Sequence, residues 1–274
     1  MNSGSDVMNR KKPTIADLRM LKGKGQVTML KVTTLEEAAA AEEAGIDIVS
    51  LPEELVTHPD YRKVAPSLFS MTGKVHLEAG TRDDYLRWSL RVLAEGADAV
   101  YCSAGLGTVE HLAREFIPVV GHVGLVPSRV TWTGGFKAVG KTAQKAITLY
   151  QECKAYEEAG TFAVEIEVVP VEVATEISKR VNLLLWSMGA GPGCDAQYLF
   201  AEDILGTNRG HMPRHSKVYR NLAAEFDRLQ RERVAAFSEY IADVRSGAYP
   251  EDKHIVHMPE AEWNAFMRVI DKAR

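Results

Sequence analysis

The sequence has few cysteines and prolines, no long apolar run and no excess of positive charge. Only three cysteines and 11 prolines occur among its 274 residues. No apolar run approaches the ~20 residues that a membrane-spanning helix needs, and residues 1–14 lack the apolar core of a signal peptide. We therefore expect a cytoplasmic protein without a membrane partner. The net charge of −4, from 33 basic and 37 acidic residues, also argues against nucleic acid as a partner.

The three cysteines, Cys102, Cys153 and Cys194, have neither the spacing of metal ligands nor the even number that a disulfide framework requires. Three reduced thiols are therefore expected. The remaining composition, with 46% hydrophobic and 26% charged residues, is that of an ordinary globular core. The chain length suits one large α/β domain.

A repeated order of helix, glycine and strand predicts the architecture. Helical patterns end at Gly45, Gly96 and Gly160, and an apolar run follows each glycine. Glycine is favoured there because it readily adopts the left-handed conformation that ends a helix. Further apolar runs typical of buried strands are 27–30, 117–122 and 183–186.

Such alternation over about 250 residues fits a closed barrel or an open doubly wound sheet. The barrel is favoured, because no G-x-G-x-x-G opens a helix after the first strand and no phosphate-binding G-x-x-x-x-G-K-[ST] occurs. We therefore predict an α/β fold, a (β/α)₈ TIM barrel with a C-terminal helical extension. Residues 1–274 are expected to form one domain, with 218–274 as charged amphipathic helices.

Polar residues at the ends of the predicted strands are the candidates for chemistry, because the active site of a parallel barrel lies at the carboxyl ends of its strands. Alternation places Glu165 and Glu167 on one side of their strand, where they act either as proton acceptors or in an ion pair with Lys or Arg. His122 ends another strand as a ligand-binding or a structural residue. The other candidates are Lys31, Glu53, Glu54, His76, Glu78, Tyr101 and Ser103.

Two features of the sequence, the pair His76 and Glu78 and a glycine-rich stretch, leave alternatives open. His76 and Glu78 share a face of a strand expected over 74–78, and they form either a metal site or a polar pair. The glycine-rich stretch 187–193 follows a predicted strand, and it is either a tight turn or a loop whose backbone amides approach an anion.

Six short motifs occur in the order and near-spacing of ketopantoate hydroxymethyltransferase, and the chain resembles that family from Lys12 to His257. The motifs are GHVGLVP at 121–127, GGFK at 134–137, EVVP at 167–170, GAG at 189–191, PRH at 213–215 and SGAYP at 246–250. The resemblance implies a (β/α)₈ barrel of the phosphoenolpyruvate mutase and isocitrate lyase superfamily. It also implies a homo-oligomer, often a decamer.

The resemblance further implies an aldol-type reaction on a small-molecule keto acid. In the family, Mg²⁺ chelates the carboxylate and keto oxygen of 3-methyl-2-oxobutanoate and so acidifies the neighbouring C–H bond. A glutamate removes that proton, and the enolate attacks a one-carbon unit from 5,10-methylenetetrahydrofolate. Glu167 stands at the position of this catalytic base, and His122 stands at the substrate-contacting histidine.

The expected metal ligands differ from the family's residues. Pro52-Glu53-Glu54 replaces Gly-Asp-Ser, which places Glu53 at a ligand aspartate and Glu54 beside the substrate. The second ligand aspartate corresponds to Glu78, or to Gly73 without a deletion. Tyr101-Cys102-Ser103 replaces Lys-Ile-Glu, so Tyr101 and Ser103 are expected to contact the substrate.

Three functions follow from these observations. The first is the hydroxymethyltransferase reaction with Mg²⁺ held by Glu53 and Glu78. The second is a C–C lyase or transferase reaction on another keto acid. The third is ligand binding by a non-catalytic homologue.

Overall fold

The computed structural model describes residues 10–74 and 80–272. The chain divides into two compact units, Met1–Arg220 and Asn221–Arg274. The boundary lies close to residue 218, where the C-terminal helices are predicted to begin. That both units form one domain stays a prediction.

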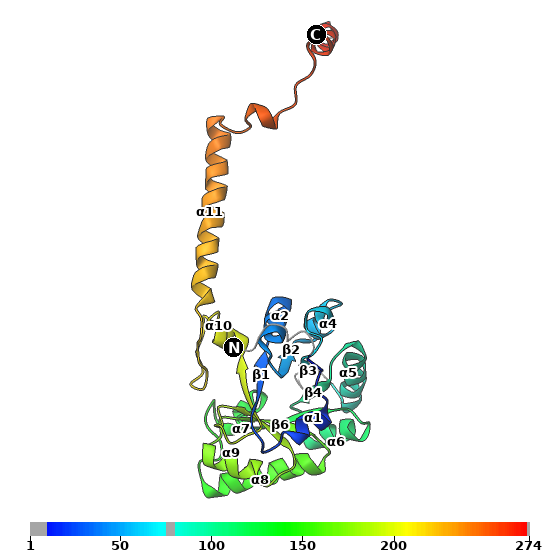
Figure 1. The fold of residues 1–274 in the computed structure, drawn as a ribbon, viewed down its shortest axis with the longest axis vertical. Helices are drawn as coiled ribbons and strands as arrows, with labels where there is room; N and C mark the ends of the chain where they lie inside the picture. Colours follow the sequence, from blue (N-terminus) through cyan, green and yellow to red (C-terminus); the bar gives the residue numbers. More distant parts are fainter. Residues whose placement is uncertain (1–9, 75–79, 273–274) are drawn as a thin grey trace. The chain divides into compact units, whose positions relative to one another are not determined.

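The first unit is a closed barrel of eight parallel strands in sequence order, surrounded by helices (Figure 1). This arrangement confirms the predicted TIM barrel. The strands are β1 Val27–Lys31, β2 Ile48–Leu51, β3 Phe69–Lys74, β4 Ala99–Cys102, β5 Val119–Gly124, β6 Ala163–Glu167, β7 Leu184–Met188 and β8 Ala196–Phe200.

The helices of this unit begin and end largely where capping residues predict. Gly45 ends α2 with φ 82°, and Gly96 ends α5. Residues 189–195 connect β7 to β8 without a helix. The helices are α1 Ile15–Met20, α2 Leu35–Ala44, α3 Glu53–Val56, α4 Tyr61–Val64, α5 Arg82–Glu95, α6 Leu106–Arg114, the 3₁₀ helix η2 Pro127–Arg129, α7 Val130–Thr133, α8 Ala143–Glu158, α9 Val171–Ser178 and α10 Ala201–Leu205.

The third strand differs in position from the prediction. The sequence pattern predicts a strand over 74–78, whereas β3 ends at Lys74 and pairs with β2 and β4. Ser70, Thr72 and Gly73 interrupt the apolar run of β3, so its sequence lacks the signal that marks the other buried strands. His76 and Glu78 lie outside the described residues.

Large apolar side chains fill the amino-terminal half of the barrel. Phe162 makes edge-on contacts with Phe69 and Trp186, with ring centroids 6.2 and 5.8 Å apart. Leu18 of α1 belongs to the same buried cluster. These side chains pack the amino-terminal end of the barrel interior.

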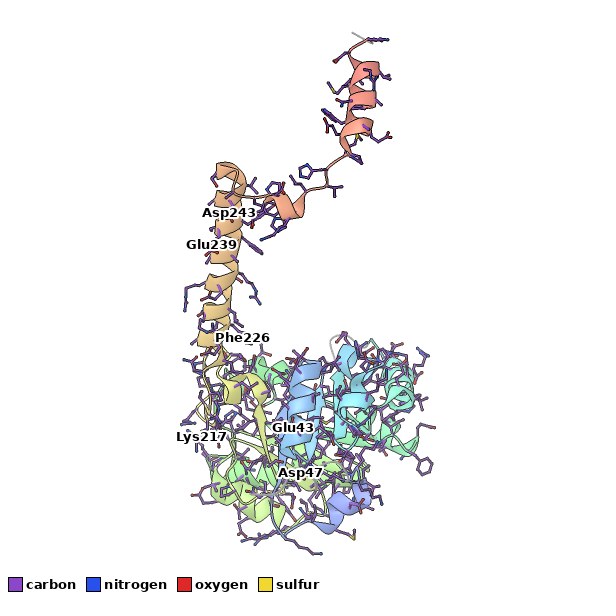
Figure 2. All side chains as sticks on the ribbon, turned by 45° about the horizontal axis from the view of Figure 1, so that its top comes forward. Glu43, Asp47, Lys217, Phe226, Glu239 and Asp243 are labelled. Carbon is purple, nitrogen blue, oxygen red and sulfur yellow. The ribbon has the colours of Figure 1, made fainter. Side chains whose placement is uncertain are left out.

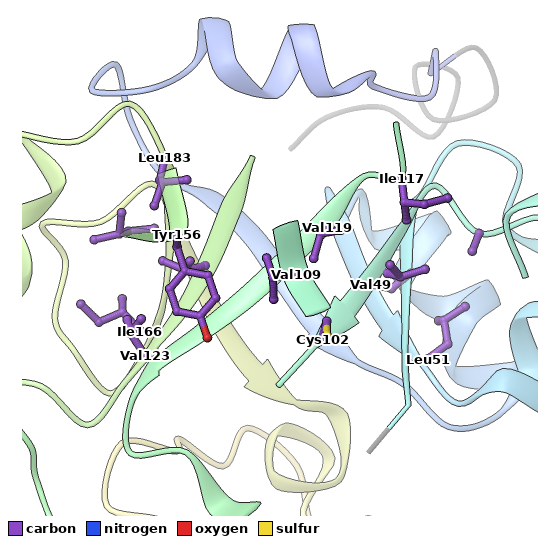
Figure 3. Close-up of a cluster of buried hydrophobic side chains, with 14 of the residues drawn as sticks. Val49, Leu51, Cys102, Val109, Ile117, Val119, Val123, Tyr156, Ile166 and Leu183 are labelled. Atoms are coloured by element: carbon purple, nitrogen blue, oxygen red, sulfur yellow. The ribbon is translucent and has the colours of Figure 1, made fainter. Parts of the chain in front are cut away.

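A second apolar layer lies between the strands and the surrounding helices (Figure 3). Tyr156 of α8 packs against β5, where a Cβ at Gly121 would lie 2.5 Å from its ring. Cys102, Cys153 and Cys194 are free and buried, as predicted. In the described parts of the chain, no helix is long and apolar enough to cross a membrane.

The second unit consists of α11 Leu222–Ser246, the 3₁₀ helix η3 Asp252–His254 and α12 Glu260–Ile270 (Figure 1). Neither α11 nor α12 has a buried residue. Both helices lie within residues 218–274, where charged amphipathic helices are predicted.

Candidate active site

A cavity of about 1280 Å³ opens at the carboxyl ends of the strands. Several strands contribute residues to its wall, and the loops after β5 and α10 complete it. Its lining includes Lys31, Ser50, Gly73, Tyr101, Ser103, His122, Glu165, Glu167, Met188, Tyr198, Phe200, Asp203, Arg214 and His215. The position is where catalytic residues of parallel barrels are found.

His122 and two glutamates form a buried cluster in this cavity. His122 lies opposite Glu165 on the neighbouring strand, and Gly124 lies opposite Glu167. The Nε2 of His122 is 3.1 Å from Oε2 of Glu167, and its Nδ1 is 3.6 Å from Oε2 of Glu165. In the described parts of the chain, neither carboxylate has a salt bridge to Lys or Arg, so neither is held in the ion pair that the sequence left as an alternative.

Tyr101 holds the other side of the imidazole. Its hydroxyl oxygen is 2.7 Å from Nδ1 of His122, and the two rings meet edge-on at 5.8 Å. Burial and the charge of Glu165 raise the pKa of the Tyr101 hydroxyl, so it stays protonated at neutral pH. This contact fixes the orientation of the ring, and therefore the direction in which Nε2 points.

Burial raises the pKa of Glu165 to about 7, because its carboxylate is removed from water. The charge of Glu167 raises this pKa further, whereas His122 and Lys31 lower it. The cluster can therefore take up or release a proton close to neutral pH.

This raised pKa predicts that stability falls as the pH rises. An unfolded glutamate titrates near 4.5, so between pH 4.5 and about 7 the folded protein holds a proton that the unfolded chain has lost. The free energy of unfolding therefore decreases through this window and levels off above it. In Glu165→Gln, which cannot ionise, the melting temperature is expected to decline less steeply between pH 5 and 8. The exposed Glu36→Gln variant is the control, and equal slopes in all three proteins would contradict the prediction.

The backbone around Glu167 is tightly constrained. Val168 has φ 49°, a conformation that costs a β-branched residue about 1–3 kcal/mol. The carbonyl oxygen of Glu167 accepts a hydrogen bond from the Leu125 amide at 2.9 Å, and the Val168 amide donates to Met188 at 2.9 Å. Gly124 packs so closely that a Cβ there would lie 2.4 Å from the Glu167 carbonyl oxygen. These contacts direct the Glu167 side chain into the cavity.

The predicted metal ligand Glu53 does not line this cavity. Glu53 begins α3, where its carboxylate accepts a hydrogen bond from Nε1 of Trp88 at 2.5 Å and pairs with Arg91. Partial burial opposes ionisation of Glu53, but the bonds from Arg91 and Trp88 lower its pKa overall. Glu54 is exposed, and neither glutamate lines the cavity. Glu78 lies outside the described residues, so the proposed pair of ligands stays a prediction.

The described side chains do not fit the Mg²⁺ site that the resemblance implies. The two nitrogens of His122 point in different directions, each toward a different glutamate, so the three groups do not converge on one ion. No other cluster of three His, Cys, Asp or Glu residues in the described ranges could hold a metal ion. At Gly73, the alternative ligand position, a Cβ would lie 2.8 Å from the Tyr101 ring, so the tyrosine occupies the space of a carboxylate there.

Several residues of the cavity wall have no role predicted from the sequence. Lys31 is identified from the sequence as a polar residue at the end of a strand, without a role. Tyr198 lies on β8, whose sequence has no apolar run that predicts a strand. Side chains alternate between the two faces of a strand, and this alternation along β8 could have identified Tyr198 as a residue that faces the interior. At Gly189, a Cβ would lie 2.9 Å from the His215 ring, so tight packing accounts for this glycine.

Comparison with known proteins gives one consistent result. A family model described as ketopantoate hydroxymethyltransferase matches residues 77–252. A 3-methyl-2-oxobutanoate hydroxymethyltransferase of Hyperthermus butylicus is 33% identical over 96% of this chain and 97% of that protein. A protein of Methylibium petroleiphilum named 3-methyl-2-oxobutanoate hydroxymethyltransferase 1 is 30% identical over 97% and 96%.

Solved structures are more distantly similar. Phosphonopyruvate hydrolase in complex with oxalate and Mg++ and 2,3-dimethylmalate lyase each have a TM-score of 0.48 and 14% identity. Each match covers 95% of this chain and 99% of that chain.

Proposed function

Because the chain belongs to the ketopantoate hydroxymethyltransferase family, and is a transferase of that type, we propose that it transfers a hydroxymethyl group to 3-methyl-2-oxobutanoate. The observation that carries this proposal is the buried pair of Glu167 and His122, which faces the cavity at the carboxyl ends of the strands. A base in this position reaches a bound keto acid, as aldol chemistry requires.

The first step is removal of the C3 hydrogen of the keto acid by the Glu167 carboxylate. The C–H bond breaks, the proton goes to Glu167, and the electron pair forms an enolate whose negative charge lies mainly on the oxo oxygen. C3 then forms a bond to the methylene carbon of 5,10-methylenetetrahydrofolate as the bond from that carbon to one folate nitrogen breaks. Water adds its oxygen to the same carbon as the second carbon–nitrogen bond breaks, which gives the hydroxymethyl group. The proton held by Glu167 and the proton lost by water go to the two nitrogens, and tetrahydrofolate leaves.

The neighbouring residues position the two reacting groups. His122 lines the cavity, where it is proposed to contact the substrate, and its Nε2 lies 3.1 Å from Oε2 of Glu167 while Tyr101 contacts Nδ1. Ser103 lines the cavity beside Tyr101, and both are proposed to contact the keto acid. Glu54 is exposed and does not line the cavity, so the structure does not support the predicted contact between Glu54 and the substrate.

The enolisation step can be tested without the one-carbon donor. Purified protein is incubated with 3-methyl-2-oxobutanoate in D₂O, and loss of the C3 proton signal is followed by NMR. Protein-dependent exchange, followed by ketopantoate formation when 5,10-methylenetetrahydrofolate is added, supports the proposal. Exchange only with a different keto acid favours a divergent transferase or lyase, and binding without exchange favours a non-catalytic homologue.

We also propose that the second unit joins copies of this chain in a homo-oligomer. Seven large apolar side chains of α11 are at least 40% exposed, and their spacing places them on one helical face, with Glu239 on the opposite face. Phe226 and Glu239 are labelled on this helix in Figure 2. The seven are Phe226, Leu229, Val234, Phe237, Tyr240, Ile241 and Val244. An apolar stripe of this length is typical of a protein interface.

A charge on this stripe is expected to break the assembly. Phe237→Glu would place a carboxylate in an apolar interface, where desolvation is costly, so the assembly mass should fall. Light scattering after size-exclusion chromatography measures this mass. Glu239→Gln, on the opposite face, is expected to leave it unchanged. An unchanged mass for Phe237→Glu would contradict the proposed interface.

A further inference from the structure

The cavity needs a positive charge for the proposed reaction. A 2-oxo acid brings a carboxylate, and its enolate carries further negative charge on the oxo oxygen. Glu165 and Glu167 line the same cavity, so the substrate enters a site that already holds acidic groups. Stabilising the developing charge is usually the largest single contribution to such catalysis. The described residues form no divalent-cation site, so we consider which charged side chain of the described cavity wall can supply this charge.

Lys31 has the right position on the barrel wall. It is the last residue of β1, and the register places it beside Ser50 on one side and Phe200 on the other. Its ammonium lies 4.7 Å from the centre of the Phe200 ring. The side chain is half-buried and lines the cavity. Among the residues that the structure describes, no hydrogen bond or salt bridge engages this ammonium, so its donors are available to a ligand.

The charge of Lys31 reaches the catalytic cluster. It lowers the pKa of Glu165, although burial of that carboxyl dominates and raises the pKa overall. A ligand between Lys31 and Glu167 would therefore contact a cation on one side and the proposed base on the other. The ring face of Phe200, which also lines the cavity, stabilises the ammonium.

The other basic residues near the cavity are less well placed. Lys74, at the end of β3, also lines the cavity, but its charge acts on Glu53, whose pKa it lowers, whereas the charge of Lys31 acts on Glu165. Arg129 donates to the carbonyl oxygens of Ser103 and Ala104. Lys137 and Arg214 come from loops, not from the strands that form the wall.

We infer that Lys31 binds the carboxylate of the keto acid and offsets the charge of its enolate, in the role that the family's divalent cation would otherwise fill. The inference rests on the proposed function, since it concerns how the same substrate is held. The ammonium forms a charge-assisted hydrogen bond to the substrate and takes no part in covalent chemistry.

Calorimetric titration with 3-methyl-2-oxobutanoate tests this assignment. The keto acid is titrated into wild type once in a buffer that contains EDTA and once in a buffer that contains Mg²⁺. The affinity of wild type for the keto acid is expected to be the same in both buffers. Lys31→Met is expected to bind about 10–100-fold more weakly, because a charged hydrogen bond is lost. Lys31→Arg keeps the charge and is expected to lose at most about tenfold. Lys24→Met removes an exposed lysine at the amino-terminal end of the barrel and should bind as wild type does.

The outcomes separate the inference from the proposed function when C3 exchange is measured in the same samples. Binding and exchange that disappear with EDTA would overturn the role of Lys31 and leave the proposed function intact. Undiminished binding by Lys31→Met would also overturn it. Binding that depends on Lys31 but gives no exchange would support the inference and contradict the proposed reaction. No binding by wild type in either buffer would overturn both. If treatment with borohydride traps a covalent adduct on Lys31, detected by intact mass, Lys31 forms an imine with the keto acid. That result would overturn the proposed ion pair.

Discussion

Replacing Glu167 with Gln is expected to lower the rate of C3 proton exchange by about 10²–10⁴-fold, the usual contribution of a positioned general base. The amide keeps the size of the side chain but cannot accept the proton. Because Glu167 is on the cavity wall, the fold and the affinity for the keto acid should change little. NMR exchange rates, calorimetric affinity and the melting temperature together measure these three properties.

A glutamate outside the cavity gives the matched control for this experiment. Glu172 lies in the first turn of α9 and is exposed, so Glu172→Gln removes the same charge from the surface. Its exchange rate is expected to equal that of wild type. If Glu167→Gln exchanged the C3 proton as fast as this control, another group would have to be the base. Glu165→Gln would then be the next variant to measure, because its carboxylate lies on the other side of His122.

The barrel was predictable because its signals are local. Each helix that ends at glycine before an apolar run needs only neighbouring residues to be recognised, and the two-residue spacing of Glu165 and Glu167 already places them on one face of β6. The position of β3 was not predictable in this way. Its polar residues fit their places through pairing with β2 and β4, which a single apolar run does not reveal.

The candidate site was predictable only where its geometry follows from strand alternation. His122 and Glu167 lie on the wall because of their strand positions. Glu53 was assigned from a motif position, but its contacts with Trp88 and Arg91 come from a helix more than 30 residues later in the sequence. Such long-range partners decide where a carboxylate points, and they cannot be read from local sequence.

Replacing Gly124 with Ala is expected to damage both stability and activity. The residue has φ 87°, which disfavours any side chain, and the new Cβ would lie 2.4 Å from the Glu167 carbonyl oxygen. Backbone must therefore move, and a loss of about 3 kcal/mol in the free energy of unfolding is expected. A shift of about 1 Å in the base can cost on the order of a hundredfold in rate. Urea denaturation and C3 exchange measure the two effects.

Gly107→Ala separates this close approach from a general effect of adding a methyl group. Gly107 lies in α6 and is exposed, and a Cβ added there would have no heavy atom within 4 Å. Alanine is the better helix former by about 1 kcal/mol, so this variant should be at least as stable as wild type and fully active. If Gly124→Ala kept wild-type exchange rates, the position of the Glu167 backbone would not matter to the reaction. The strained backbone of Val168, next to Glu167, would then have no role in catalysis. We expect instead that this strain is retained because it holds the Glu167 carboxylate in the cavity.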